Sequence, residues 1–456
     1  MMMMTASSST SSSSSSTTSS TSSTSSVDYE DGNISSELVR VGQSSRLLAL
    51  EDTFRVFTSS TTFVNDIWQR RPFICKEKVP NIAGAFVMTD VKESVDRDFI
   101  EAGRGTFSEK SGGWNMAAVS TPRGSSFDDA KLRFEDVQMA LKQTSGTVVF
   151  NSAGGFIPKL AGVCLDALNA FQYPTALNMY LTNAGQRTSA PPHTDKQDVF
   201  VLQTQGYKRW RVFAPPPTSR MPKADPYARG KSKDVLDLSE LGEPLLDHVM
   251  SPGQVLYVPG GFPHTTDTVT GIASDSEPSV HLTVGVDTHI WDLSYAGLRK
   301  LALTKADVSD KAILTKSEWY WRLQDALPLG FLAPNRQSSV EEHKLLLFSG
   351  LISRLRLIEP AKFDSMSDSE ITASLSLEEL YPRIVQHHAD ITDIFGQLYA
   401  DVAFKISPSK MDLSFFRSQP YFNRLEQCME AYLAWSKPLA QKKTTNSKGG
   451  GFGKRA

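Results

Sequence analysis

Two short segments about seventy residues apart in this chain must lie side by side if its most distinctive side chains act together. The first reads His193-Thr194-Asp195, and in extended backbone residues two positions apart point to the same side of a strand. The second places His264 after an apolar run and a Pro/Gly turn, within GQVLYVPGGFPHTTD. Two imidazoles and one carboxylate can hold Fe(II) and leave further coordination positions open. The spacing therefore predicts a metal site of His193, Asp195 and His264 built on two strands.

The surroundings of this HxD motif favour a strand-built site over two unrelated histidines. The motif alone is a weak signal, because patterns of three residues often arise by chance and a single histidine is usually an ordinary core or surface residue. Pro191 and Pro192 restrict the backbone that leads into His193, since each proline fixes its own φ angle. Directly after the motif, Asp198–Gly206 and Lys208–Ala214 read as two consecutive strands, the first of which ends at a glycine.

Lys208 is predicted to point inward from the second of these strands. Alternation puts it on the same face as Trp210 and Val212, with Arg209 and Arg211 on the opposite face. Buried charges in proteins are usually paired, and a compact ammonium group suits one carboxylate end of a dicarboxylate co-substrate. The alternative is an ordinary strand lysine whose stem is buried and whose charged end reaches water. The neighbouring metal motif favours the first interpretation.

The segment from Asn178 to Pro215, together with LYVPGGFPHTTDT and SVHLTVG, resembles the cupin-4 branch of the Jumonji C (JmjC) oxygenases. That branch contains the ribosomal oxygenases, which are Fe(II)- and 2-oxoglutarate-dependent histidyl or arginyl hydroxylases of proteins. The upstream segments FVNDIWQRRP and GGFIPKL also resemble the family, so the resemblance covers roughly Phe63 to Trp291. It implies a dioxygenase that uses Fe(II), 2-oxoglutarate and O2 and acts on a protein, with a ribosomal protein or a histone as the expected substrate.

The resemblance also implies roles for individual residues. The family's metal ligands fall on His193, Asp195 and His264. Its lysine for the distal carboxylate of 2-oxoglutarate falls on Lys208, and an asparagine near the co-substrate falls on Asn178, at a slightly different spacing from the motif. In such an enzyme 2-oxoglutarate is oxidatively decarboxylated to succinate while the substrate gains a hydroxyl group.

The residues flanking Asp195 depart from the family pattern, in which a tyrosine and an aspartate are typical. Here they are Thr194 and Lys196, and the lysine changes the charge at the mouth of the site. Substrate identity is therefore not carried over, and both hydroxylation of a side chain and demethylation of an N-methyl group stay open. The alternative functions are a non-oxidative metal-binding cupin and a scaffold protein with a vestigial site. The inward Lys208 argues against the first alternative, and the complete ligand set argues against the second.

Strand and helix patterns predict an α+β fold, with N-terminal α/β elements, a double-stranded β-helix (the cupin jelly roll) and a helical C-terminal region. Short apolar or alternating runs between Gly/Pro turns read as barrel strands: TALNMYLT, DVFVLQTQ, KRWRVFA, QVLYVP and VHLTVGV. Apolar spacings of three and four residues predict helices at Lys159–Phe171, Lys316–Ala326, Glu341–Ile358 and Leu375–Ile406. We expect five parts: a disordered Ser/Thr-rich N-terminus (1–43), the N-terminal part of the JmjC region (44–172), the barrel with the metal site (173–290), a helical region (291–436) and a basic disordered tail (437–456).

The helical region carries a stripe of leucines with two interpretations. The stripe either faces a second copy of the chain, which would make a homodimer, or packs onto the chain's own barrel; its members are Leu345, Leu346, Leu347, Leu351 and Leu355. In the family that the chain resembles, the region that follows the barrel in the sequence forms a dimer interface, which favours the first interpretation. A winged helix, which the family also has in this region, is not evident after Leu375.

Three further histidines and one loop have open interpretations. His387 and His388 are adjacent on a predicted helix, so they point in different directions and are expected to be structural. His281 lies on a predicted strand near the site and either supports the metal ligands from behind or belongs to the core. The polar loop Met221–Glu243 is either a substrate lid or a surface insertion.

Composition fits a globular protein of a reducing compartment. The chain has 456 residues with a net charge of −2, so as a whole it lacks the polyelectrolyte character of a nucleic-acid-binding protein, and no apolar run is long enough for a bilayer. Its 3 cysteines are far apart, which argues against a disulfide framework. Met1–Ser26 predicts disorder, with an organellar transit peptide as the alternative. The basic tail Lys437–Ala456 predicts a solvated end, with a nuclear address or a contact with RNA as the alternative. From the family we expect an intracellular protein of the nucleus or nucleolus.

Overall fold

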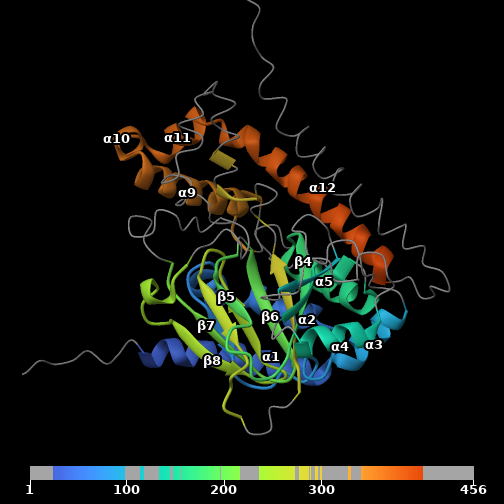
Figure 1. Ribbon diagram of the computed structural model, residues 1–456. Helices are drawn as coiled ribbons and strands as arrows, with labels where there is room; N and C mark the ends of the chain where they lie inside the picture. Colours follow the sequence, from blue (N-terminus) through green and yellow to red (C-terminus); the bar gives the residue numbers. More distant parts are fainter. Residues whose placement is uncertain are drawn as a thin grey trace, which may run out of the picture.

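Two antiparallel β-sheets form the centre of the molecule (Figure 1). The computed structural model describes residues 24–97, 113–117, 133–143, 147–151, 153–155, 157–195, 197–215, 236–272, 277–286 and 340–403, with short pieces between 288 and 329. The strands are β1 (Phe73–Cys75), β2 (Gly113–Ala117), β3 (Thr147–Asn151), β4 (Thr175–Thr182), β5 (Ala190–His193), β6 (Asp198–Gln205), β7 (Lys208–Val212), β8 (Leu246–Met250), β9 (Val255–Val258), β10 (His264–Asp267) and β11 (Ser279–Val286). The larger sheet has the order β1-β9-β6-β11-β4-β3-β2, and the smaller sheet has the order β5-β10-β7-β8.

From β4 to β11 the chain alternates between the two sheets. Every step along the sequence changes sheet except the step from β7 to β8, which are antiparallel neighbours. β11 lies between β4 and β6 and pairs with both along most of its length. The five strands predicted from the sequence are confirmed as β4, β6, β7, β9 and β11. The content of helix and antiparallel sheet agrees with the predicted α+β class.

Helices cover the face of the larger sheet that is turned away from the smaller one. They are α1 (Thr24–Ser44), α2 (Glu51–Ser59), α3 (Met88–Asp96), α4 (Phe134–Gln143) and α5 (Pro158–Phe171), with short helical turns at Phe63–Ile67 and Ala153–Gly155. On this face the ring of Phe200, from β6, stacks on Phe171 of α5 at 4.7 Å and meets Phe54 of α2 edge-on. On the opposite face of β6, Val199 and Val201 pack against the smaller sheet. Because both faces of β6 are apolar, the larger sheet is buried between helices and the smaller sheet.

Helix α1 corrects the prediction that residues 1–43 are disordered. Residues 1–23 lie outside the described part, but Thr24–Ser44 is helical and packs against α2. Its buried residues Ile34, Leu38 and Val41 are separated by four and three positions, which is the spacing of one helix face. The prediction was wrong here because the Ser/Thr-rich composition of the extreme N-terminus was extended over a segment with its own helical pattern.

The C-terminal helices lie together beyond the sheets (Figure 1). They are α9 (Val340–Ile358), α10 (Pro360–Phe363), α11 (Asp368–Ser374) and α12 (Leu377–Ala403). The helices predicted at 341–358 and 375–406 are thereby confirmed, with ends that differ by a few residues. The long helix α12 runs from this group down to α5, where the hydroxyl of Tyr399 donates to the carbonyl of Thr175. The helical region is therefore anchored on α5 and the start of β4.

The partner-facing interpretation of the leucine stripe is wrong for three of its members. Leu347, Leu351 and Leu355 are fully buried in a core shared with α10, α11 and α12. Leu345 and Leu346 stay exposed, at 69% and 40%. A sequence pattern marks an apolar face but does not say what covers it, and here the following helices of the same chain do so. A homodimer remains a prediction, without support from these buried leucines.

Some predicted features fall on residues that the structure does not describe. They are the helix at 316–326, Lys196, most of the loop at 221–243 and the basic tail at 437–456. Within the described residues, no helix has both the length and the apolar character that crossing a bilayer demands. The cysteines Cys75 and Cys164 are buried free thiols, and Cys164 lies in the core as predicted.

Candidate metal centre

The three residues of the predicted metal motif meet at one end of the smaller sheet. His193 ends β5, His264 begins β10, and the two are directly opposite each other in the antiparallel pairing of these strands. Asp195 follows β5 by two residues. One ligand atom from each of the three lies within 4.8 Å of the others. The Asp195 carboxylate is 3.9 Å from Nε2 of His193 and 3.5 Å from Nε2 of His264.

Backbone contacts fix the orientation of these ligands. Nδ1 of His264 lies 3.0 Å from the carbonyl oxygen of Phe262, so this nitrogen donates and Nε2 is left with a lone pair that faces Asp195. The backbone N–H of Gly261 donates to the carbonyl of Asp195 at 2.8 Å, which ties the turn before β10 to the loop after β5. Both histidines are buried, whereas the Asp195 side chain is 32% exposed. The site is thus closed on the imidazole side and open beside the carboxylate.

The donor set fits a divalent transition metal. Imidazole nitrogen and carboxylate oxygen suit Fe, Zn, Cu and Ni, and two histidines with one carboxylate on one face are typical of non-haem Fe(II) sites. Three protein ligands leave coordination positions open, which a catalytic metal needs and a structural one does not.

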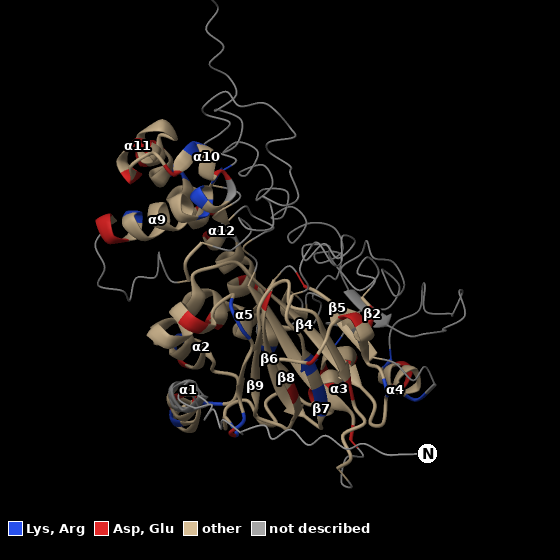
Figure 2. Ribbon diagram, turned by 90° about the vertical axis from the view of Figure 1, so that its left-hand side faces the viewer, with Lys and Arg blue, Asp and Glu red and all other residues tan. Residues whose placement is uncertain are grey.

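Lys208 lines the same cavity as the metal motif. Its side chain is 1% exposed, and Nζ donates to Oγ1 of Thr182, on β4, at 2.9 Å. The predicted face is confirmed, since Trp210 and Val212 are buried with it while Arg209 and Arg211 are half-buried. Figure 2 shows the basic residues of β7 in blue within a mostly tan sheet. His264 pairs with Val212, and at about 3.3 Å per residue Lys208 therefore lies roughly 13 Å farther along β7.

Aromatic rings form a wall of the cavity between the metal motif and Lys208. His281 stacks on Tyr180 at 4.8 Å with nearly parallel planes, and Trp210 meets His281 edge-on at 5.5 Å. Trp210 also stacks on His264 at 5.8 Å. The ring of His281 is buried and lines the cavity, and its support of the metal ligands stays a prediction. Sequence reasoning missed Tyr180, although its position two residues before Thr182 places it on the same face of β4.

Asn178 lies on the cavity side of β4, two residues before Tyr180. Its partner across the pairing with β11 is Thr283, which lines the cavity. Among the described residues the cavity lining does not include Asn178. Its role near a co-substrate stays a prediction.

A buried carboxylate that sequence reasoning missed holds the turn in front of His264. Asp198, at the start of β6, accepts hydrogen bonds from the Tyr257 hydroxyl at 2.7 Å, the Gly260 N–H at 3.2 Å and the Gln69 amide at 3.0 Å. Burial raises the pKa of Tyr257 well above its usual value, and the nearby Asp198 charge adds to this. The hydroxyl therefore stays protonated and keeps donating. No local sequence signal marks Asp198, because its partners come from two segments far from it in the sequence, one with Gln69 and one with Tyr257 and Gly260.

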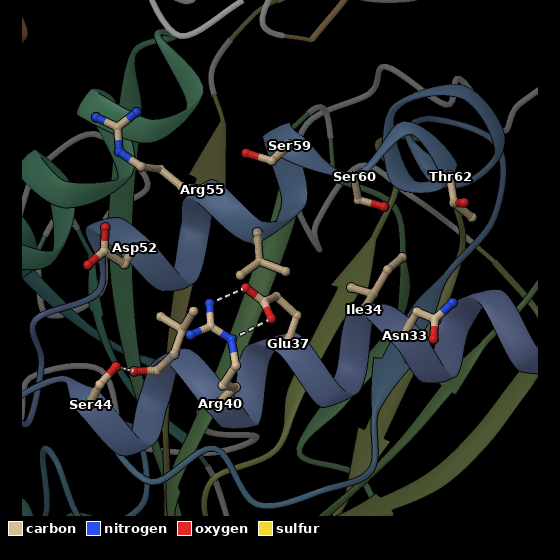
Figure 3. A pocket seen from close by; sticks show the side chains of 12 residues that line it. Asn33, Ile34, Glu37, Arg40, Ser44, Asp52, Arg55, Ser59, Ser60 and Thr62 are labelled. Atoms are coloured by element: carbon tan, nitrogen blue, oxygen red, sulfur yellow. Dashed lines mark hydrogen bonds and ion pairs between the residues drawn. The ribbon is translucent and has the colours of Figure 1, made fainter.

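A second, open groove lies between α1 and α2 (Figure 3). Its two arginines pair within their own helices, Arg40 with Glu37 and Arg55 with Glu51. His387 and His388 are buried in α12, apart from the residues that line the cavity of the metal motif. Neither place adds a ligand to the metal centre.

Comparison with known proteins shows what the segment that carries the site is similar to. Residues 156–292 match the family model described as the JmjC domain. This segment contains the metal motif, Lys208 and all strands from β4 to β11. The predicted resemblance to JmjC oxygenases is therefore confirmed for this part of the chain.

The matches to named relatives cover only part of each relative's length. Rat ribosomal oxygenase 2 is 27% identical over 227 residues, which are 49% of this chain and 44% of that protein. The bifunctional lysine-specific demethylase and histidyl-hydroxylase NO66 of Drosophila melanogaster is 35% identical over 131 residues, which are 29% of this chain and 18% of that protein. The chain thus spans less than half the length of these curated relatives. Among solved structures, Escherichia coli ribosomal oxygenase YcfD is 15% identical with a TM-score of 0.33, over 64% of this chain and 65% of that one.

Proposed function

We propose that this chain is an Fe(II)- and 2-oxoglutarate-dependent dioxygenase that hydroxylates a side chain of a protein substrate. The observation that carries the proposal is that the His193, Asp195 and His264 side chains and the buried Lys208 ammonium line one cavity. A metal-binding cupin without oxygen chemistry would need the three ligands but has no use for the lysine. The match to the JmjC domain supports the same assignment.

His193, Asp195 and His264 would hold the iron. When bound, iron supplies the oxidative chemistry that couples decarboxylation of 2-oxoglutarate to hydroxylation of the substrate. The chain's own contribution is orientation: the Phe262 carbonyl sets the tautomer of His264, and the Gly261 N–H fixes the backbone of Asp195. Such partners behind the ligands hold the donor atoms in place before a metal arrives.

Lys208 would bind the distal carboxylate of 2-oxoglutarate. A charge-assisted hydrogen bond between ammonium and carboxylate is about twice as strong as a neutral one. Burial strengthens it further, because Lys208 is almost fully buried and water competes little there. The four-residue separation of Lys208 from the strand position that faces His264 leaves room for a short dicarboxylate between them.

The two sheets would form the cupin jelly roll that the resemblance implies. The alternation of β4 to β11 between sheets supports this, as does the order of four paired strands in each half, β9-β6-β11-β4 and β5-β10-β7-β8. Sites built on strands are positioned more rigidly than sites on loops. In this arrangement the ligands and Lys208 all come from the smaller sheet or the loop that leaves it.

A protein substrate is proposed from the names of the relatives, which are a ribosomal oxygenase and a lysine-specific demethylase and histidyl-hydroxylase. A ribosomal protein is the first candidate and a histone the second. The exposed side of Asp195 is where such a side chain would approach. A place in the nucleus or nucleolus is proposed on the same grounds.

Succinate release tests the function directly. The full chain would be incubated with Fe(II), ascorbate and 2-oxoglutarate, with and without ribosomal-protein or histone peptides, beside the His264→Ala variant. We expect the wild type to release succinate and His264→Ala to release none. The correct peptide should increase succinate release and should gain the mass of one oxygen. A wild type that binds metal but releases no more succinate than His264→Ala would contradict the oxygenase and leave a metal-binding cupin.

A further inference from the structure

A chain of buried hydrogen bonds leads from Lys208 to a strand that precedes the matched JmjC segment. Lys208 donates to Oγ1 of Thr182, which lies 2.8 Å from Oγ1 of Thr147 on β3. Thr147 Oγ1 in turn donates to the carbonyl oxygen of Ser189 at 2.9 Å. The side chains of Lys208, Thr182 and Thr147 are all 2% exposed or less. At such burial these hydrogen bonds are shielded from competing water.

The number of available protons fixes the direction of each hydrogen bond. A carbonyl oxygen only accepts, so the single hydroxyl proton of Thr147 goes to Ser189. Thr147 must then accept from Thr182, whose own proton is used in that bond. Thr182 therefore turns a lone pair toward the Lys208 ammonium, which can only donate. The donors and acceptors of these hydrogen bonds fit in one order only, from Lys208 to Thr182 to Thr147 to Ser189.

The far end of the chain of hydrogen bonds returns to the cavity. The Ser189 N–H donates to the carbonyl of Thr266 at 2.9 Å, and the two hydroxyls are 2.8 Å apart. Ser189 and Thr266 both line the cavity, and Thr266 lies two residues after His264 on β10. Thr147 thus connects β3 of the larger sheet with two residues of the cavity lining, with Lys208 through Thr182 and with Ser189 directly.

We propose that Thr147 is a positioning residue for Lys208, and through it for a short dicarboxylate such as 2-oxoglutarate. The inference rests on the proposed function for the role of the lysine. A lysine side chain has many rotamers, and ordering it costs conformational entropy that a fixed acceptor offsets before the ligand arrives. Because a hydroxyl is neutral, Thr182 orients the ammonium without neutralising the charge that a carboxylate would meet. Thr147 accepts the hydrogen bond from the Thr182 hydroxyl. This keeps a lone pair of Thr182 directed at the Lys208 ammonium.

Binding of 2-oxoglutarate to the Mn(II)-loaded full chain, measured by calorimetry without oxygen, tests the proposal. Thr147→Val keeps the shape of the side chain and removes its hydroxyl. It should raise the dissociation constant for 2-oxoglutarate about five- to tenfold, the effect of one buried hydrogen bond. Thr147→Ser, which keeps the hydroxyl, should restore affinity to within about threefold. The Mn(II) dissociation constant, titrated separately, should stay the same in all variants.

Thr175→Val is the matched control. Thr175 is a buried threonine on β4 whose hydroxyl donates to the carbonyl of Cys164 at 3.0 Å, on the opposite face of the sheet. Its loss should leave 2-oxoglutarate binding unchanged. Thr182→Val breaks the same connection from the other side and should weaken binding at least as much as Thr147→Val, which keeps the test open if the latter does not fold.

The outcomes separate the inference from the function on which it rests. A wild type that does not bind 2-oxoglutarate contradicts the proposed function, and the inference with it. A wild type that binds, together with Thr147→Val and Thr182→Val variants that bind equally well, overturns the inference alone. Equal losses of 2-oxoglutarate and Mn(II) affinity in Thr147→Val would show a merely structural residue and also overturn it.

Discussion

The molecule buries two pairs of histidines, one in the strand-built metal centre and one in helix α12, and their environments differ. His193 and His264 lie opposite each other on paired strands, with ring centroids 4.2 Å apart and Nε2 atoms that face one carboxylate. His387 and His388 are adjacent on a helix, so their rings leave it in different directions. His388 uses its Nε2 to donate to the carbonyl of Gln172 and packs edge-on against Tyr173.

Burial is nearly the same in the two pairs, so burial does not decide what a histidine does. All four are between 2% and 4% exposed. The difference is which nitrogen the protein uses for itself. Nδ1 of His264 is hydrogen-bonded to the backbone, which leaves Nε2 for a metal. In His388 it is Nε2 that is hydrogen-bonded to a backbone carbonyl, that of Gln172. The histidines on the strands are therefore placed for binding, whereas His388 docks α12 against the segment between α5 and β4.

The largest expected effect tests whether the helical region is a packed core. Leu351→Glu puts a carboxylate where the native side chain is fully buried, and we expect a loss of more than about 4 kcal/mol in the free energy of unfolding. Denaturant unfolding of the full chain measures it. Leu345→Glu, at a position 69% exposed on the same helix, should change stability by less than about 0.5 kcal/mol. A stable Leu351→Glu protein that merely turned from dimer to monomer would restore the partner-facing interpretation.

Exchanging one histidine of each pair for alanine should separate binding from docking. His264→Ala removes a metal ligand and should lower succinate release by more than about 100-fold, since even groups behind a ligand are worth 10- to 100-fold. His388→Ala loses a buried hydrogen bond and should lower stability by about 1–3 kcal/mol. Turnover per folded molecule should be unchanged in His388→Ala. Near wild-type turnover in His264→Ala would show that the metal assignment is wrong.

Lys208→Ala should weaken 2-oxoglutarate binding without affecting the metal. The loss of a hydrogen bond to a charged group is worth about 1.5–3 kcal/mol, which is roughly ten- to a hundredfold in affinity. Anaerobic calorimetry on both proteins measures it, with the metal dissociation constant as the internal control. Equal affinities for 2-oxoglutarate would mean that Lys208 is only a buried structural lysine.

The smallest expected effect is a dependence of stability on pH that arises from His388, in the histidine pair of helix α12. Burial lowers the pKa of His388 from 6.5 to about 4, against the hydrogen bond to Gln172, which raises it. Because the pKa of His388 is lower in the folded protein than in the unfolded chain, the unfolded chain binds the proton at a higher pH. The contribution of neutral His388 to stability is therefore fully present above pH 6.5 and is lost as the pH falls toward 4. At pH 5 the loss is on the order of 2 kcal/mol. His388→Gln should lose this slope.

The comparison of wild type with His388→Gln is needed because another group acts in the opposite sense. Burial raises the pKa of Asp166 from 3.8 to about 6, so its carboxylate costs stability above that pH and the cost disappears as the pH falls through the same window. The total slope therefore mixes both groups, and only the difference between the two proteins isolates the histidine. Identical slopes in the two proteins would contradict a neutral, buried His388.

Local pattern was enough to predict the metal motif and the strands that carry it. Side chains two apart on a strand share a face whatever the rest of the chain does, so Lys208 and Trp210 could be placed on one face before any fold was known. Asp195 lies just beyond the end of β5, and only the folded chain brings its carboxylate to His193 and His264. The same reasoning found α5, α9 and α12, because apolar spacing of three and four residues is also a local property. Glycine and proline marked where the strands end.

Partners far apart in sequence could not be predicted in this way. Thr147 and Asp198 look ordinary in the sequence, and their roles appear only where β3 meets β4 and where Gln69, Tyr257 and Gly260 converge on one carboxylate. The buried leucines of α9 show the same limit, because an apolar helix face does not reveal which other element packs against it. The sequence by itself determined which side of each element is apolar or chemically active. Tertiary packing alone decided which sides meet, because a contact between distant segments depends on the whole arrangement of sheets and helices.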